Sequence, residues 1–157
     1  MLLGGFPLLL GFLGICGFTP TRAGACTCVP LPPLTSIRIV REIAAIYDEV
    51  LEGVVVKVDY IRAPRPVSKG EFPIDEAVAT VALTRRWRGS GPDTVIVRTA
   101  LHVTACGLGF QQGERYLLFA RKAGTSPLYA DTCGPSRRWD EEAERLAKLL
   151  GPGNRVQ

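Results

Sequence analysis

The sequence contains a single histidine, His102, among 157 residues, and this scarcity excludes several kinds of chemistry. One histidine cannot build a His-based metal site, and the sequence offers no Ser-His or Cys-His pair with a third orienting group. Gly107-Leu108-Gly109 is rich in glycine, but it is not followed by the Lys-Ser or Lys-Thr of a phosphate-binding loop. We therefore expect a protein that is not an enzyme and needs no cofactor.

Strong charge and sequence repeats are also missing. The formal net charge is only +4, which is too mild to predict nucleic-acid binding. No internal repeat or low-complexity segment is present, so repeat architectures are excluded. We expect the clustered charges to lie on solvated faces, namely Arg85, Arg86, Arg88, Arg137 and Arg138, together with Glu141, Glu142 and Glu144.

The apolar run from Leu2 to Phe18 is shorter than the roughly 20 unbroken residues of a membrane span, and it contains glycine. A polar break follows, and then the small residues Ala23-Gly24-Ala25, which fit a signal-peptidase site. This pattern predicts a secretory signal over residues 1–25, although its leading end carries no Lys or Arg. The mature protein would be secreted, to the periplasm or the extracellular space, with no membrane association. There are two alternatives. The segment could be an uncleaved membrane anchor, or Cys16 or Cys26 could be lipidated.

Removal of this segment leaves four cysteines, Cys26, Cys28, Cys106 and Cys133. An even number in a small exported domain predicts two disulfides. A direct Cys26–Cys28 bond is set aside, because an extended Cys-x-Cys places both side chains on one face, about 6.6 Å apart along the strand. Two pairings remain, and either attaches the new N-terminus to the body of the domain at two adjacent points.

Periodicity predicts a mainly β domain with a helix near each end. Ser36 or Thr35 can cap a helix over about 36–49, and Asp140 can cap a last helix that Gly151-Pro152 ends. Strands are predicted over residues 51–61, 77–87, 94–99, 116–121 and 128–132. Five short strands indicate a small closed barrel. We expect one domain over residues 26–150, followed by a tail over 151–157.

Several short motifs carry a resemblance to a known family. They are Cys26-Thr27-Cys28-Val29-Pro30 at the predicted new N-terminus, Trp87-Arg88-Gly89, Ala105-Cys106-Gly107, Gly113-Glu114-Arg115-Tyr116-Leu117-Leu118, and Asp131-Thr132-Cys133 with Trp139 six residues later. In these motifs, across about residues 26–150, the chain resembles the tissue inhibitors of metalloproteinases, in their N-terminal netrin-like domain.

The resemblance implies a five-stranded OB-type closed barrel with flanking helices and the pairings Cys26–Cys106 and Cys28–Cys133. Arg38 stands where the family has a third cysteine of the opening segment. The family's separate C-terminal domain is also missing, so the chain resembles a single-domain version, as in exported bacterial proteins.

The resemblance further implies a monomeric inhibitor whose partner is a zinc metalloprotease. The free amine and carbonyl of Cys26 would chelate the zinc of the target, in the complex only, and Thr27 would enter the pocket beside the zinc. Cys28, Val29 and Pro30 would lie along the substrate groove, with Thr104 and Ala105 completing the contact. The alternative is an exported netrin-like binding module for a protein or polysaccharide, without inhibitory activity. A copper site at Cys26 and Cys28 would need reduced thiols, against the export signal.

Overall fold

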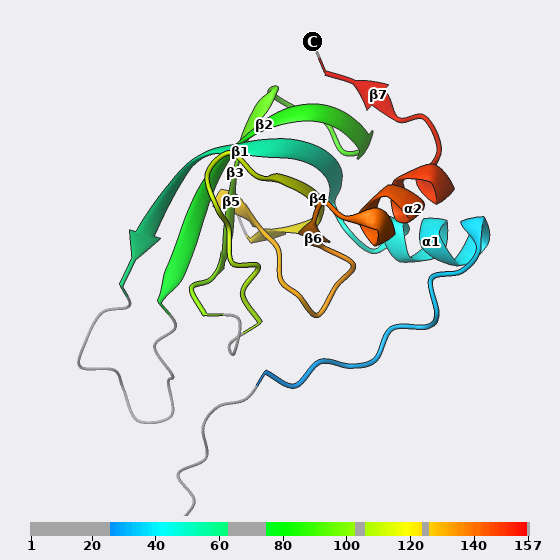
Figure 1. Ribbon diagram of the computed structural model, residues 1–157, viewed down its shortest axis with the longest axis horizontal. Coiled ribbons are helices and arrows are strands. Elements are labelled where there is room, and N and C mark those ends of the chain that lie inside the picture. Colours follow the sequence, from blue (N-terminus) through cyan, green and yellow to red (C-terminus); the bar gives the residue numbers. More distant parts are fainter. Residues whose placement is uncertain (1–25, 63–74, 103–105, 124–125, 157) are drawn as a thin grey trace, which may run out of the picture.

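The computed structural model describes residues 26–62, 75–102, 106–123 and 126–156, and its centre is a closed barrel (Figure 1). The five barrel strands are β1 (Glu49–Ile61), β2 (Glu76–Arg88), β3 (Thr94–Ala100), β4 (Arg115–Ala123) and β5 (Ser126–Tyr129). Their order around the barrel is β1-β2-β3-β5-β4, and a β1–β4 pairing closes the ring. Among the strand pairs of the described residues, β3–β5 is the parallel one. This confirms the predicted fold class.

The β1 strand belongs to two hydrophobic clusters because its side chains alternate between the two faces of the sheet. Leu51 and Val55 point into the barrel core, whereas Val50 packs with the helices outside. Register shifts interrupt the β1–β2 ladder at three points, one of them between Glu52 and Gly53. Such bulges bend a strand, and β1 can therefore pair with β2 along its length and with β4 at its start.

The two helices pack together on one side of the barrel (Figure 1). The first, α1 (Ile37–Ala45), begins where predicted, because the Ser36 side chain accepts a hydrogen bond from the Ile39 backbone N–H. The prediction that it continues to residue 49 was wrong. The Asp48 backbone N–H already bonds to the Ala120 carbonyl, which brings the chain alongside β4. The helix therefore stops before β1 starts.

The second helix, α2 (Glu141–Leu150), has the predicted boundaries. The Asp140 side chain caps its start through the Ala143 backbone N–H, and Gly151 ends it with a φ of 97°. Two short strands were not predicted, β6 (Arg137–Arg138) beside β4 and β7 (Asn154–Arg155) beside β2. Val156, next to β7, packs against the barrel core.

Two other expectations needed correction. Arg86 is not part of a solvated face, because only 11% of its side chain is exposed and it donates hydrogen bonds to the carbonyls of Gly91 and Pro92. The fifth strand ends at Tyr129 rather than at residue 132. Asp131 forms a side-chain turn with the residues that follow it, which takes the chain away from the sheet.

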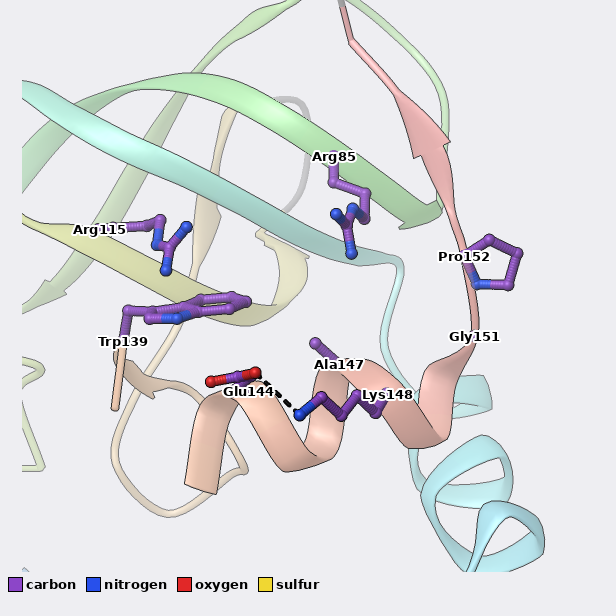
Figure 2. A pocket seen from close by; sticks show the side chains of 8 residues that line it. All are labelled: Arg85, Arg115, Trp139, Glu144, Ala147, Lys148, Gly151 and Pro152. Carbon is purple, nitrogen blue, oxygen red and sulfur yellow. Dashed lines mark ion pairs between the residues drawn. The ribbon is translucent and has the colours of Figure 1, made fainter. Parts of the chain in front are cut away.

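A pocket of about 670 Å³ lies between the barrel and α2 (Figure 2). It is lined by Arg85, Arg115, Trp139, Glu144, Ala147, Lys148, Gly151 and Pro152. Among the residues that the structure describes, no helix has the length and apolar character needed to cross a membrane.

Candidate functional site

The four cysteines pair as Cys26–Cys106 and Cys28–Cys133, with Cα–Cα distances of 5.3 and 5.1 Å. This confirms both disulfides and their pairing. The two bonds lie side by side, and the four sulfur atoms all fall within 4.8 Å of one another. The Sγ atoms of Cys26 and Cys28 are 3.5 Å apart, so both side chains leave the N-terminal segment on the same side. Disulfides are typical of proteins outside the reducing cytoplasm.

The first anchor point on the body of the domain is the turn at Cys106. Cys106 has a φ of 67°, and among the described residues it is the one non-glycine residue with a positive value. A Cβ added to Gly107 would run into the Ala100 carbonyl oxygen, so the chain can pass this point only with glycine. The buried Thr99 hydroxyl accepts a hydrogen bond of 3.1 Å from the Leu108 backbone N–H. These contacts fix the direction in which the Cys106 side chain points.

The second anchor point is the turn at Cys133. One carboxylate oxygen of Asp131 accepts hydrogen bonds from the backbone N–H groups of Cys133, at 2.9 Å, and Gly134, at 3.1 Å. The Thr132 backbone N–H donates to the Cys106 carbonyl at 3.0 Å, which connects this turn to the first one. The two anchor turns are therefore joined by a backbone hydrogen bond in addition to the disulfides.

The N-terminal segment, defined as residues 26–30, lies on the outside of the molecule. Cys26 is half-buried, whereas Thr27, Cys28, Val29 and Pro30 are exposed. Val29 is 84% exposed, which is the largest value among the exposed hydrophobic residues of the described chain. The segment belongs to no helix or strand. An exposed segment that is fixed at Cys26 and Cys28 leaves the side chains between and after these two residues accessible.

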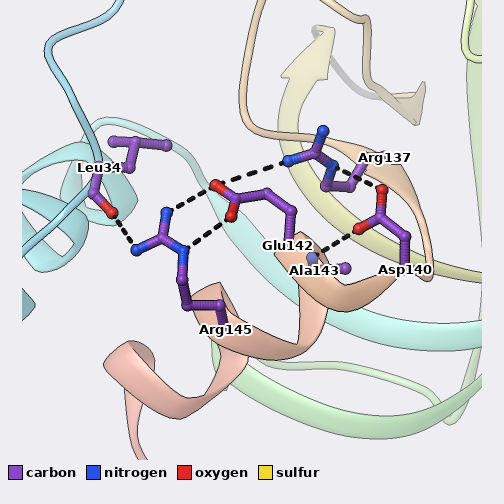
Figure 3. A network of polar contacts seen from close by, with 6 residues as sticks. All are labelled: Leu34, Arg137, Asp140, Glu142, Ala143 and Arg145. Atoms are coloured by element: carbon purple, nitrogen blue, oxygen red, sulfur yellow. Dashed lines mark hydrogen bonds and ion pairs between the residues drawn. The ribbon is translucent and has the colours of Figure 1, made fainter.

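A second attachment holds the chain beyond this segment (Figure 3). Arg145 of α2 donates a 2.7 Å hydrogen bond to the Leu34 carbonyl and two more to the Glu142 carboxylate. Hydrogen bonding from Arg145 lowers the pKa of Glu142. Arg137 is also close to Glu142, at 3.8 Å. The chain from Cys28 to Leu34 is thus attached at both ends. Leu34 also packs against the hydrophobic cluster that contains buried residues of both helices.

The remaining expected contact residues, Thr104 and Ala105, lie outside the described residues. In the sequence they directly precede Cys106, the disulfide partner of Cys26. His102 is exposed beyond the end of β3, as expected of a surface residue.

The oxidised cysteines also bear on metal binding. A cysteine binds metal as a thiolate, and all four sulfurs are in disulfides. The copper alternative at Cys26 and Cys28 therefore has no ligand in this state. The four sulfurs cannot ligate zinc either while they are in disulfides.

Sequence reasoning missed the pocket beside α2 and two buried acids at the start of β1. The Glu49 side chain is 4% exposed and lies close to Arg86. The Glu52 side chain is 6% exposed and lies close to Arg85 and Arg115. The signal was present in the sequence, because two acidic residues flank the apolar pair Val50-Leu51 at the start of a strand. A carboxylate on such a strand needs a cation next to it.

The sequence matches no protein-family model and no curated protein. Because a barrel of this type hosts many functions, function has to be argued from the site.

Proposed function

We propose that the mature protein is a secreted, non-enzymatic inhibitor of zinc metalloendopeptidases. Cleavage after Ala25 would make Cys26 the first residue. Its free amine and its carbonyl oxygen would then take the open coordination position that a catalytic zinc keeps for water. The zinc belongs to the target protease, and the inhibitor carries none of its own.

The observation that carries this proposal is the double attachment of the N-terminal segment. Cys26 and Cys28 are bonded to two neighbouring turns of the domain, while the residues from Thr27 to Pro30 are exposed. A free peptide would lose conformational entropy on entering a protease groove, and a segment that is already fixed avoids most of that cost. The arrangement combines rigidity with access, which are the two properties that an inhibitory segment needs.

The remaining residues have roles that follow from their positions. Thr27 would enter the specificity pocket beside the zinc, and Val29 and Pro30 would extend along the substrate groove. Thr104 and Ala105, which Cys106 connects to Cys26, would form the second part of the contact. The resemblance of the opening residues to the metalloproteinase inhibitors supports the same assignment.

The deciding experiment compares two versions of the exported protein, one that begins at Cys26 and one that retains Ala25. Both are assayed against a panel of zinc endopeptidases. The extra residue turns the amine into an amide and removes the chelating group, so inhibition is expected to weaken by about a hundredfold, equivalent to about 2.7 kcal/mol. An alanine added after Gln157 is the matched control, because it lengthens the chain equally without touching the amine.

The pH dependence supplies a second readout. Only the neutral amine can bind metal, and an ordinary α-amino group has a pKa of about 7.7–8.0. Inhibition should therefore weaken as the pH falls from 8 to 6. Equal inhibition by the Cys26 and Ala25 forms would reject chelation. Absence of inhibition by both forms across the panel would leave the binding-module alternative.

A further inference from the structure

The pocket beside α2 lies apart from the N-terminal segment, and the proposed inhibition does not use it. Its walls come from β2, the start of β4, and α2 with the residues that follow it (Figure 2). Its volume of about 670 Å³ is within the roughly 300–1,000 Å³ of sites that hold small organic ligands. It is therefore large enough for a molecule of the size of a sugar.

A buried carboxylate orients the two arginines of this pocket. Glu52, with a side chain that is only 6% exposed, lies 3.7 Å from Nε of Arg85 and 3.5 Å from an Nη of Arg115. Glu52 Oε2 is buried without a hydrogen-bond partner. A single carboxylate therefore faces two guanidinium groups that both reach the pocket.

Aromatic rings fix the same two arginines. The Arg115 guanidinium lies over the Trp139 ring, 3.9 Å from its centroid, and that of Arg85 lies 5.3 Å from the centroid of Trp87. Figure 2 shows Arg115 above the Trp139 ring, and Arg85 beside it on the barrel side of the pocket, across from α2. A guanidinium has five N–H donors, and the contact of each arginine with Glu52 uses one nitrogen. Donors remain on both for a ligand.

The charges of the pocket favour an anion. Three cations, Arg85, Arg115 and Lys148, stand against two carboxylates, Glu52 and Glu144. Glu144 forms an ion pair of 2.8 Å with Lys148 on the exposed face of α2. The net charge of these five groups is +1. The planar guanidinium groups of the two arginines match the geometry of carboxylate, phosphate and sulfate groups.

We propose that this pocket binds an organic oxyanion, a sugar acid or sugar phosphate, whose acidic group lies between Arg85 and Arg115. The body of the ligand fills the space toward Ala147, Gly151 and Pro152. This binding function is independent of protease inhibition, because it needs neither the free amine nor the disulfides.

The test is calorimetric titration of the full protein with four probes: glucuronate, glucose 6-phosphate, glucose and inorganic phosphate. Both acidic sugars should bind, neutral glucose should not, and inorganic phosphate should bind more weakly than glucose 6-phosphate. Arg115→Gln should weaken binding by about tenfold or more, because it removes a charge-assisted hydrogen bond. Arg121→Gln is the matched control, since Arg121 is another exposed arginine of β4 that lies over an aromatic ring, that of Tyr47.

Glu144→Gln is expected to raise the affinity for the acidic sugars, whereas damage to the fold would lower it. This variant therefore distinguishes an effect on binding from an effect on folding. The substitution removes a negative charge from the pocket lining and breaks the Glu144–Lys148 ion pair, so Lys148 becomes available to the acidic group of the ligand. Failure of both acidic sugars to bind the wild-type protein would overturn the proposal. An unchanged affinity in Arg115→Gln, or equal affinities for inorganic phosphate and glucose 6-phosphate, would also overturn it.

Discussion

Removal of one disulfide gives a quantitative test of how the N-terminal segment is attached. The variant carries the two substitutions Cys28→Ser and Cys133→Ser, and the Cys26–Cys106 bond is left intact. The two cysteines are 105 residues apart, and a loop of that size alone would contribute about 4.8 kcal/mol in the chain-entropy model.

The neighbouring disulfide reduces this figure. With Cys26 and Cys106 still joined, the shortest path from Cys28 to Cys133 runs two residues back to Cys26, across the remaining bond, and 27 residues forward from Cys106. That loop of about 29 residues corresponds to about 3.6 kcal/mol. The opposite pair, Cys26→Ser with Cys106→Ser, reopens a loop of similar size. Both variants should therefore lose about 3.5 kcal/mol, although the two bonds differ in sequence separation, 80 against 105.

The assay is equilibrium unfolding in urea, which gives the free energy of unfolding of each variant. Replacement of all four cysteines should remove about 8 kcal/mol, enough to unfold many single domains. A loss below about 1 kcal/mol in either double variant would contradict this account, because the chain-entropy model requires each bond to restrict the unfolded chain. A loss in the quadruple variant no larger than that in a double variant would refute it equally.

Three further predictions concern the body of the domain. Gly107→Ala should destabilise the protein by about 3 kcal/mol or more, measured by urea unfolding, because the new Cβ meets the Ala100 carbonyl oxygen. Ser136→Ala should cost about 1–3 kcal/mol in the same assay, since the buried Ser136 hydroxyl bonds to both the N–H and the carbonyl of Phe119. Burial raises the pKa of Tyr116, so the folded state favours the neutral phenol, and the free energy of unfolding should fall as the pH rises above about 10. Tyr116→Phe should make the free energy of unfolding fall less steeply above pH 10. If the variant and the wild-type protein show the same pH profile, this role of Tyr116 is wrong.

Most of the barrel could be predicted because its strands alternate clearly. β1, β2 and β3 were found to within two residues at each end, and both helix caps, Ser36 and Asp140, were correct. The errors lie where side chains compete with the backbone pattern. Asp131 ended the last barrel strand early by forming its own turn, and α1 stopped at Ala45 because the next residues pair with β4.

The candidate site was also predictable only in part from the sequence. The sequence indicated that Cys26 and Cys28 are attachment points, because an extended Cys-x-Cys sends both side chains to one face. Counting cysteines left two pairings open, and the resemblance to a family selected one of them. The structure bears out that pairing by placing Cys106 and Cys133 in adjacent turns, which the Thr132–Cys106 hydrogen bond connects.

Short-range periodicity, capping chemistry and the cysteine count were enough to indicate the fold class, the helix caps and the redox character of this protein. Which charges are buried, and which groups face them, depends on tertiary contacts. The sequence shows Glu52 next to an apolar pair at the start of a strand, but barrel closure is what places it beside Arg85 of β2 and Arg115 of β4. Contacts of that kind join residues that are far apart in the chain, and no local pattern encodes them.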